Sequence, residues 1–294
     1  MTLRSQRLRP YAPLVWLAPA VLYLLALTIY PLLYSVQVSF TTTTAGAGGF
    51  TAANFFRLLR DRLFFISLGQ TAVYTAVALA AEFSLGLTLA LMVDWGMRAG
   101  AALIKPVRAL LLVPMLLPPV VVAVIWRLIY NPDFGVLNGS LKSLGVNTAS
   151  LTWLAGENTA LFSVILVDVW QWTPFMFLLL LAGLQALPVE PFEAARVDGA
   201  SAWETFRLLT LPLLQPVILV ALLLRTMDLT RVFDQIFILT QGGPGFATET
   251  ASLFIYRTAF RFYDFGYAAV LSFVMLAFIT MLARVFLRVL RRPV

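Results

Sequence analysis

Four ionisable side chains lie close together in a segment that is otherwise apolar. Within residues 217–240 these are Arg225, Asp228, Arg231 and Asp234. A charge at the centre of a membrane helix costs about 2.5–3.5 kcal/mol, so these groups must face protein or water. Guanidinium and carboxylate groups can bind the hydroxyls of a polar solute, or they can pair with each other. Asp228 is three residues from both Arg225 and Arg231, which permits either pairing.

A helix through this segment separates the four charges. At about 100° per residue, Arg225, Leu229 and Val232 share one face, and Asp228 lies beside Arg225. Asp234 falls on the opposite side. We therefore expect Arg225 and Asp228 to face a water-filled cavity. A purely structural pair of the same two residues is the alternative that the sequence leaves open.

A second apolar segment carries Asp168 and Gln171 at i, i+3 on one helix face, with Trp170 and Trp172 close by. Sugar rings stack on aromatic side chains, and their hydroxyls need hydrogen-bond partners, so this composition suits a sugar. The tryptophans alone fit an interfacial belt equally well. We expect Asp168 or Gln171 to contribute to solute selection, and Glu82 to pair within the helix bundle.

The composition excludes most catalytic and metal chemistry. The chain has no cysteine and no histidine, which excludes disulfides, thiol nucleophiles, imidazole bases and most zinc and haem sites. We expect no metal, no cofactor and no enzymatic activity; no Gly-x-x-x-x-Gly-Lys-Ser/Thr phosphate loop occurs, so ATP hydrolysis would need another subunit. The net charge of +7 comes from residues flanking apolar runs, which indicates membrane topology and not nucleic-acid binding.

Long apolar runs define the fold class. Hydrophobic residues make up 61% of the 294 residues and charged residues 12%, whereas soluble domains carry about 25% charged residues. A spanning helix needs about 20 mostly apolar residues. The sequence predicts an all-α, polytopic membrane helical bundle that forms a single transmembrane domain over residues 1–294. Its six spans are expected at 12–40, 67–93, 106–130, 159–187, 217–240 and 266–290.

The basic residues in the loops predict the orientation. With the N-terminus inside, 12 Lys and Arg fall on the cytoplasmic side and 6 on the other, so both termini are expected in the cytoplasm. Arg4, Arg7 and Arg9 precede an apolar run that is too long for a signal peptide, so the first span is expected to stay uncleaved. Residues 41–49 are expected to form a flexible turn.

One cytoplasmic loop, 188–216, departs from this basic pattern because it holds four acidic and only two basic residues. Pro191 suits the first turn of a short helix. Gly199 permits a turn with positive φ, and Ser201 with Glu204 can form the capping box of a second helix. The sequence thus predicts a cytoplasmic helix-turn-helix, which is a shape for docking and not for catalysis.

The spacing in this loop resembles the EAA loop of ABC importer permeases. Glu193-Ala194-Ala195 is followed by three residues, Gly199, nine residues, Leu209, one residue and Leu211-Pro212. Leu209 stands where the family usually has isoleucine. Three further features resemble the carbohydrate-type branch: the run Ala194–Ser201, Pro118-Pro119 with Trp126, and Leu239-Thr240-Gln241-Gly242-Gly243-Pro244. The last of these resembles the first permease of maltose and glycerol-phosphate importers.

This resemblance implies a permease in the inner membrane of a bacterium or archaeon, coupled to a cytoplasmic ATPase dimer. A second homologous permease would complete the channel, and an extracytoplasmic solute-binding protein would deliver the solute. The residues that would couple to the ATPase are Glu193, Ala194, Ala195, Asp198 and Gly199.

The resemblance also implies solute contacts in the fifth span, at Arg225, Asp228, Leu229 and Val232. Leu229 and Val232 replace polar groups of the maltose permease, which puts maltose itself in doubt. Arg225 would suit an anionic solute such as glycerol phosphate, whereas Asp228 and the tryptophans favour a neutral sugar. The chain is thus expected to form half of the translocation pathway for a sugar or sugar-like solute.

A secondary transporter, whose buried carboxylates would bind a coupling ion, is the alternative function. Such a transporter predicts two similar halves with matching broken helices. The sequence shows no such repeat.

Overall fold

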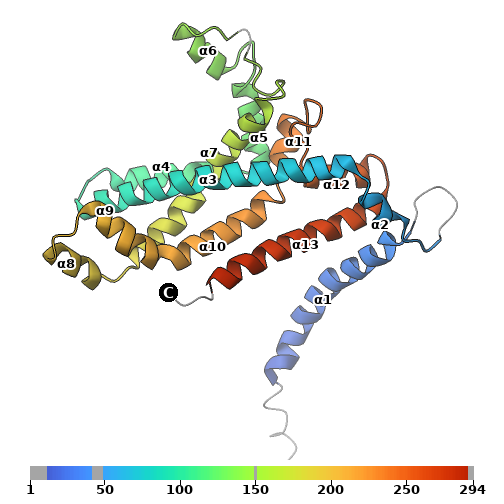
Figure 1. Cartoon of the computed structure of the whole chain (residues 1–294), viewed down its shortest axis with the longest axis horizontal. Coiled ribbons are helices and arrows are strands. Elements are labelled where there is room, and N and C mark those ends of the chain that lie inside the picture. The colour runs from blue at the N-terminus through green and yellow to red at the C-terminus, as the bar shows by residue number, and fades with distance from the viewer. Residues whose placement is uncertain (1–11, 42–48, 149–150, 291–294) are drawn as a thin grey trace, which may run out of the picture. The chain divides into compact units, whose positions relative to one another are not determined.

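The computed structural model describes residues 12–41, 49–148 and 151–290, and in these the regular secondary structure is helical apart from one isolated bridge between Thr41 and Phe50 (Figure 1). The prediction of an all-α fold is confirmed. Arg4, Arg7 and Arg9 and most of the turn expected at 41–49 lie outside the described residues. The chain divides into two compact units, Met1–Asp61 with Ile255–Val274 and Arg62–Phe254 with Met275–Val294.

The helices follow one another in the order shown in Figure 1. They are α1 (Ala12–Ser39), α2 (Ala53–Leu58), α3 (Arg62–Arg98), α4 (Ile104–Leu116), α5 (Pro119–Ile129), α6 (Val136–Ser143), α7 (Ala160–Gln185), α8 (Glu190–Val197), α9 (Ala202–Thr205), the π-helical turn η1 (Phe206–Thr210), α10 (Leu211–Leu229), α11 (Asp234–Leu239), α12 (Ala251–Phe260) and α13 (Phe265–Leu290).

Five helical stretches among the described residues are long and apolar enough to cross a membrane. They are Trp16–Ser39 of α1, α3, α7, the stretch from α9 through α10, and Phe265–Arg288 of α13. The pair α4 and α5 makes a sixth if it is taken as one broken span. The prediction of about six spans is therefore confirmed.

The expected third span, 106–130, is broken and not straight. Its two halves, α4 and α5, meet at an angle of 96°. Pro118 and Pro119 explain the break, because proline has no N–H to donate and disfavours helical geometry in the residue before it. Leu117 accordingly adopts an extended conformation, with ψ of 136°.

The expected fifth span, 217–240, also differs from a single helix. Its helix starts earlier, continues from the loop before it, and ends at Leu229. Two side chains bind the Met227 carbonyl at this end: Thr230 Oγ1 donates to it at 3.0 Å, and so does Arg231 Nε at 3.0 Å. Side-chain groups that satisfy the last carbonyls of a helix favour its termination. The short helix α11 follows as a separate element.

The larger unit is built around α7, which is the most buried of its spans. Helices α3 and α10 both pack on α7 (Figure 1). Two glycines allow this close approach, since a Cβ on Gly86 of α3 would lie 2.6 Å from Cβ of Met176, and one on Gly183 of α7 would lie 2.7 Å from Leu214 of α10. Small residues at such contacts are typical of packed membrane helices.

In the smaller unit, polar contacts hold the end of α1, α2 and the start of α13. Asn54 Nδ2 donates to the carbonyl of Thr41 at 2.9 Å, and the Arg57 guanidinium pairs with Asp264 at 2.5 Å. The hydroxyl of Tyr267 donates to Asp61 at 2.6 Å. Between Trp16 and Val38 α1 buries no residue, and only Ser39 at its end is buried, as expected of a helix whose surface meets lipid or another chain.

Candidate functional site

Arg225 on α10 lies between two carboxylates inside the larger unit. Its Nε and Nη2 donate to the two oxygens of Glu82 on α3, at 2.6 and 2.9 Å. Nη2 also donates to Asp168 on α7. The three side chains are at most 3% exposed. We call Glu82, Asp168 and Arg225 the buried triad.

The buried triad forms because three helices bring single charged residues to one point in an apolar interior. Removing charges from water costs several kcal/mol per ion, and only close pairing with further hydrogen bonds offsets this cost. The bidentate contact between Arg225 and Glu82 is the strongest geometry for such a pair. The prediction that Glu82 pairs within the bundle is confirmed.

The pairing of Asp228 differs from one expected alternative. Asp228 binds Arg231 at 3.2 Å, and both side chains are at least half exposed. Because the described contacts of Arg225 are made to Glu82 and Asp168, Arg225 and Asp228 do not form the structural pair that their i, i+3 spacing permits.

A cavity of about 390 Å³ opens beside the buried triad, and we call it the polar cavity. It brings together Asp168 on α7 with Arg225, Asp228, Leu229 and Val232, five of the six residues expected on the solute pathway. The rest of its lining is Pro119, Trp172, Arg231, Phe233, Asp234 and Gln235. The expectation that Asp234 lies on the opposite side is wrong, because the helix ends at Leu229 and the chain turns back to the cavity.

Gln171, the sixth expected residue, is fully buried and does not line the polar cavity. Its Nε2 donates to the carbonyl of Leu117 at 2.8 Å, which is the carbonyl freed by the break between α4 and α5. Its Oε1 accepts from Gln235 at 2.7 Å, and Gln235 in turn accepts from Tyr74 at 3.3 Å. This hydrogen-bond chain fixes the broken helix, since irregular backbone within a membrane needs protein partners.

Trp172 gives the polar cavity an aromatic surface. The Arg225 guanidinium carbon lies 5.0 Å from the centre of its ring, within the range of a cation–π contact. The sequence named Trp172 without distinguishing it from an interfacial anchor. Phe233 and Gln235 were missed, because their place in the cavity depends on the helix end at Leu229, which gives no local signal.

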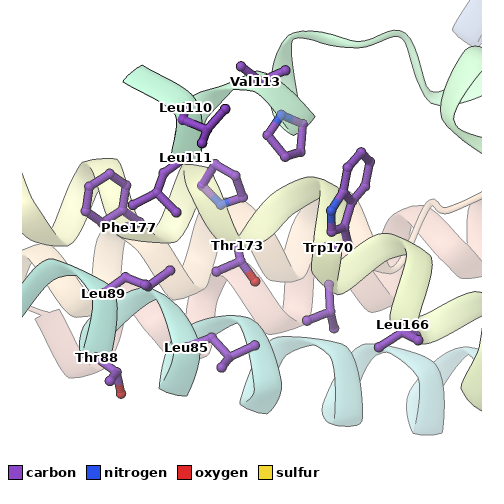
Figure 2. Close-up of a pocket in the computed structure, with 13 residues that line it drawn as sticks. Leu85, Thr88, Leu89, Leu110, Leu111, Val113, Leu166, Trp170, Thr173 and Phe177 are labelled. Carbon is purple, nitrogen blue, oxygen red and sulfur yellow. The ribbon is translucent and has the colours of Figure 1, made fainter. Parts of the chain in front are cut away.

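A larger cavity of about 630 Å³ lies between α3, α4 and α7. Figure 2 shows the side chains that line it, among them Leu85, Leu111, Trp170 and Phe177. Its lining is almost wholly hydrocarbon. Hydroxyl groups of a polar solute would lose their hydrogen bonds to water there without replacement, so the smaller polar cavity is the candidate site for a hydroxylated solute.

The loop after α7 has the expected helix-turn-helix form. Gly199 has φ of 78° between α8 and α9, and the side chains of Ser201 and Glu204 form the capping box. The second helix does not stand alone, because α9 continues through the π-helical turn η1 into α10.

This loop exposes both polar and apolar groups. Glu193, Ala194, Asp198 and Gly199 are exposed, and Ala195 is half-buried. Three large apolar side chains lie beside them in the open: Val197, Trp203 and Leu208. Exposed apolar groups rimmed by polar residues mark surfaces that bind a partner. We call this surface, made by α8, Gly199, α9 and η1, the docking loop.

Comparison with known proteins identifies the family. Residues 82–293 match the family described as binding-protein-dependent transport system inner membrane component. A trehalose/maltose transport system permease protein, MalF, of Thermococcus litoralis is 42% identical over 80% of this chain and 78% of its own length. The trehalose transport system permease protein SugA of Mycobacterium tuberculosis is 34% identical, covering 92% and 86% of the two chains.

One further relative and one solved structure extend this picture. The sulfoquinovosyl glycerol transport system permease protein SmoG of Agrobacterium fabrum is 33% identical over 94% of this chain and 89% of its own. The crystal structure of a bacterial ABC transporter that imports alginate shares the fold, with a TM-score of 0.82, 21% identity and coverage of 96% and 98%. These relatives favour an ABC permease over a secondary transporter. The chain belongs to the family of binding-protein-dependent transport system inner membrane components and is a multi-pass permease subunit of an ABC importer.

Proposed function

We propose that this permease forms half of the translocation pathway for a sugar-like solute and that the polar cavity is its solute site. The observation that carries the proposal is the lining of that cavity. Asp168 and Arg225 offer hydrogen-bonding groups next to the aromatic ring of Trp172. Sugars need this combination, because their hydroxyls require donors and acceptors and their ring faces stack on aromatic groups.

The relatives support the same solute class. Transport proteins for trehalose and maltose, for trehalose and for sulfoquinovosyl glycerol resemble this chain over most of its length. All three names describe sugars or sugar derivatives. The cavity of about 390 Å³ lies within the range of about 300–1,000 Å³ that is typical of small-molecule sites.

The docking loop would couple this site to ATP hydrolysis in a cytoplasmic ATPase dimer. Its exposed apolar and acidic groups suit a protein groove. Because α9 continues into α10, which carries Arg225 and Asp228, movement of the docking loop would move the lining of the cavity directly. This role needs the loop inside the cell, and hence both termini in the cytoplasm.

The other partners follow from the class of importer. A second, homologous permease would supply the other half of the pathway, and an extracytoplasmic solute-binding protein would deliver the solute. A solved alginate importer with the same fold has been crystallised with its solute-bound periplasmic protein. The long apolar surface of α1 from Trp16 onward is free to meet lipid or this second permease.

Filling the polar cavity tests the site. Val232 lines the cavity and is half-buried, so Val232→Trp would occupy it without opening the tightly packed interior. We expect uptake of radiolabelled trehalose by the complete importer to fall at least about tenfold, because a cavity of this size cannot hold both an indole and a sugar. ATP hydrolysis without solute should persist.

The matched control is Val220→Trp on α10. Val220 is 43% exposed and belongs to the lining of neither cavity, so the same added volume should leave uptake close to that of the parent. Normal uptake in the Val232→Trp importer would show that the solute passes elsewhere.

A further inference from the structure

More acidic than basic side chains line the polar cavity, although it contains two arginines. Three carboxylates line it, from Asp168, Asp228 and Asp234, against the guanidinium groups of Arg225 and Arg231. Directly behind the lining, Glu82 adds a fourth carboxylate in contact with Arg225. Acidic groups therefore outnumber basic groups around the cavity.

Each arginine in the lining already pairs with at least one carboxylate. Arg225 is shared between Glu82 and Asp168 in the buried interior, and Arg231 pairs with Asp228 at 3.2 Å. A nearby arginine, Arg127, donates to the carbonyl of Ile238 at 3.4 Å and does not line the cavity. Binding of a phosphate or carboxylate by arginine depends on a guanidinium charge that the protein leaves available. The cavity offers no such charge in the part of the chain that the structure describes.

Glu82 lies behind the lining of the cavity, in contact with Arg225. It is fully buried, and it does not belong to the lining. Its two oxygens accept hydrogen bonds from Nε and Nη2 of Arg225. Nη1 is then the one nitrogen of this guanidinium without a protein hydrogen bond among the described residues. The two N–H donors of Nη1 remain for neutral hydroxyls, while two carboxylates already offset the charge of Arg225.

We propose that the buried triad makes the polar cavity exclude anions, so that the transported solute is an uncharged, polyhydroxylated molecule. Glu82 is the positioning residue of this device, since it neutralises Arg225 and fixes which of its nitrogens a solute can reach. The inference rests on the proposed function and names the charge class of the solute. It distinguishes this permease from one built for a sugar phosphate or sulfonate.

Collisional quenching of Trp172 fluorescence measures the local charge directly. The full-length chain is prepared in neutral detergent micelles with its six other tryptophans replaced by phenylalanine; the chain has seven in all. Acrylamide, iodide and caesium then probe the cavity as neutral, anionic and cationic quenchers. We expect acrylamide and caesium to quench Trp172 and iodide to quench it much less, because the surrounding charge is negative.

The variant Glu82→Gln removes one negative charge from behind Arg225. A unit charge about 10 Å away, at an effective dielectric constant of about 40, changes the local ion concentration about fourfold. We therefore expect the iodide quenching constant to rise about fourfold, and the caesium constant to fall by a similar factor. Asp168→Asn should act in the same direction, which keeps the test available if Glu82→Gln does not fold.

Two controls separate charge selection from structural damage. Asp94→Asn removes a carboxylate from the same helix, α3, where it pairs with Arg98 outside the polar cavity, and it should change nothing. The double variant with Glu82→Gln and Arg225→Gln restores the original net charge of the triad, so it should restore the weak iodide quenching. A merely structural role for Glu82 predicts no such recovery.

Protection of Trp172 from quenching by added sugars is the second part of the test. We expect trehalose to protect Trp172 from acrylamide in the parent chain and trehalose 6-phosphate not to protect it, with phosphate protection appearing in Glu82→Gln. Equal iodide and caesium quenching in the parent, or protection by trehalose 6-phosphate there, would overturn anion exclusion. If the ions behave as expected and neither sugar protects, the solute site of the proposed function fails while anion exclusion stands. If no quencher reaches Trp172, the cavity is closed, and both proposals fail.

Discussion

The two ion pairs near the polar cavity should differ sharply in their contribution to stability, although both involve residues of one short segment. Arg225 is 97% buried with two carboxylate partners, whereas Asp228 and Arg231 are 50% and 58% exposed. Removing one partner of a buried pair costs about 3–5 kcal/mol, because the remaining charge is left uncompensated. An exposed pair contributes about 0–1 kcal/mol.

These magnitudes predict the effects of single alanine substitutions on the free energy of unfolding. Arg225→Ala leaves Glu82 and Asp168 facing each other without a cation, so we expect a loss of about 3–5 kcal/mol. Glu82→Ala should cost about 3 kcal/mol, the lower end of that range, because Arg225 keeps Asp168. Asp228→Ala and Arg231→Ala should each cost less than about 1 kcal/mol.

Double-mutant cycles in detergent micelles, followed by circular dichroism during denaturation with sodium dodecyl sulfate, measure the coupling. Glu82 and Arg225 are in direct contact, so their coupling energy should be about 2–3 kcal/mol. Arg225 and Asp228 share no hydrogen bond, and theirs should be close to zero. A loss for Asp228→Ala as large as that for Arg225→Ala, or strong coupling between those two, would refute the assignment of partners.

The remaining predictions concern the docking loop, the broken helix and the topology. Gly199 has φ of 78° and open space around it, so Gly199→Val should strain the backbone by about 1–2 kcal/mol and abolish solute-stimulated ATP hydrolysis. The matched control Gly145→Val, at φ of 80° in another loop, should leave this stimulation intact. Gln171→Leu should lower the free energy of unfolding by about 1–3 kcal/mol, because it leaves the Leu117 carbonyl buried without its donor; an unchanged value would mean that water replaces the amide. Reporter fusions after Met97 and Gly199 should report the cytoplasm and one after Gly145 the exterior, and an external Gly199 would contradict the docking role.

The sequence was sufficient for features that depend on neighbouring residues or on average polarity. Long apolar runs had to be helices, because a chain that crosses lipid must satisfy its own backbone hydrogen bonds. The docking loop followed from local signals: positive φ at Gly199, and a capping box between Ser201 and Glu204, which are only three residues apart. The spacing of the EAA motif is also local, and the family comparison confirmed the class of protein that it indicated.

The partners of the buried charges were not available from the sequence. Arg225 meets Glu82 across 143 residues and Asp168 across 57, and nothing in the spacing of these residues distinguishes that arrangement from a local pair with Asp228. Helical angles also failed beyond Leu229, because they assume a helix that side chains at Thr230 and Arg231 help to end.

The sequence by itself therefore determined that this protein is a helical membrane permease with a helix-turn-helix loop between α7 and α10, because hydrophobicity, caps and turns act over a few residues. Only the tertiary structure decided which charges line the polar cavity and which neutralise each other. That choice depends on how closely α3, α7 and α10 approach, which is set by packing at Gly86 and Gly183 across segments far apart in the chain. A buried charge takes the partner that packing brings within hydrogen-bonding distance, and not the one nearest in sequence.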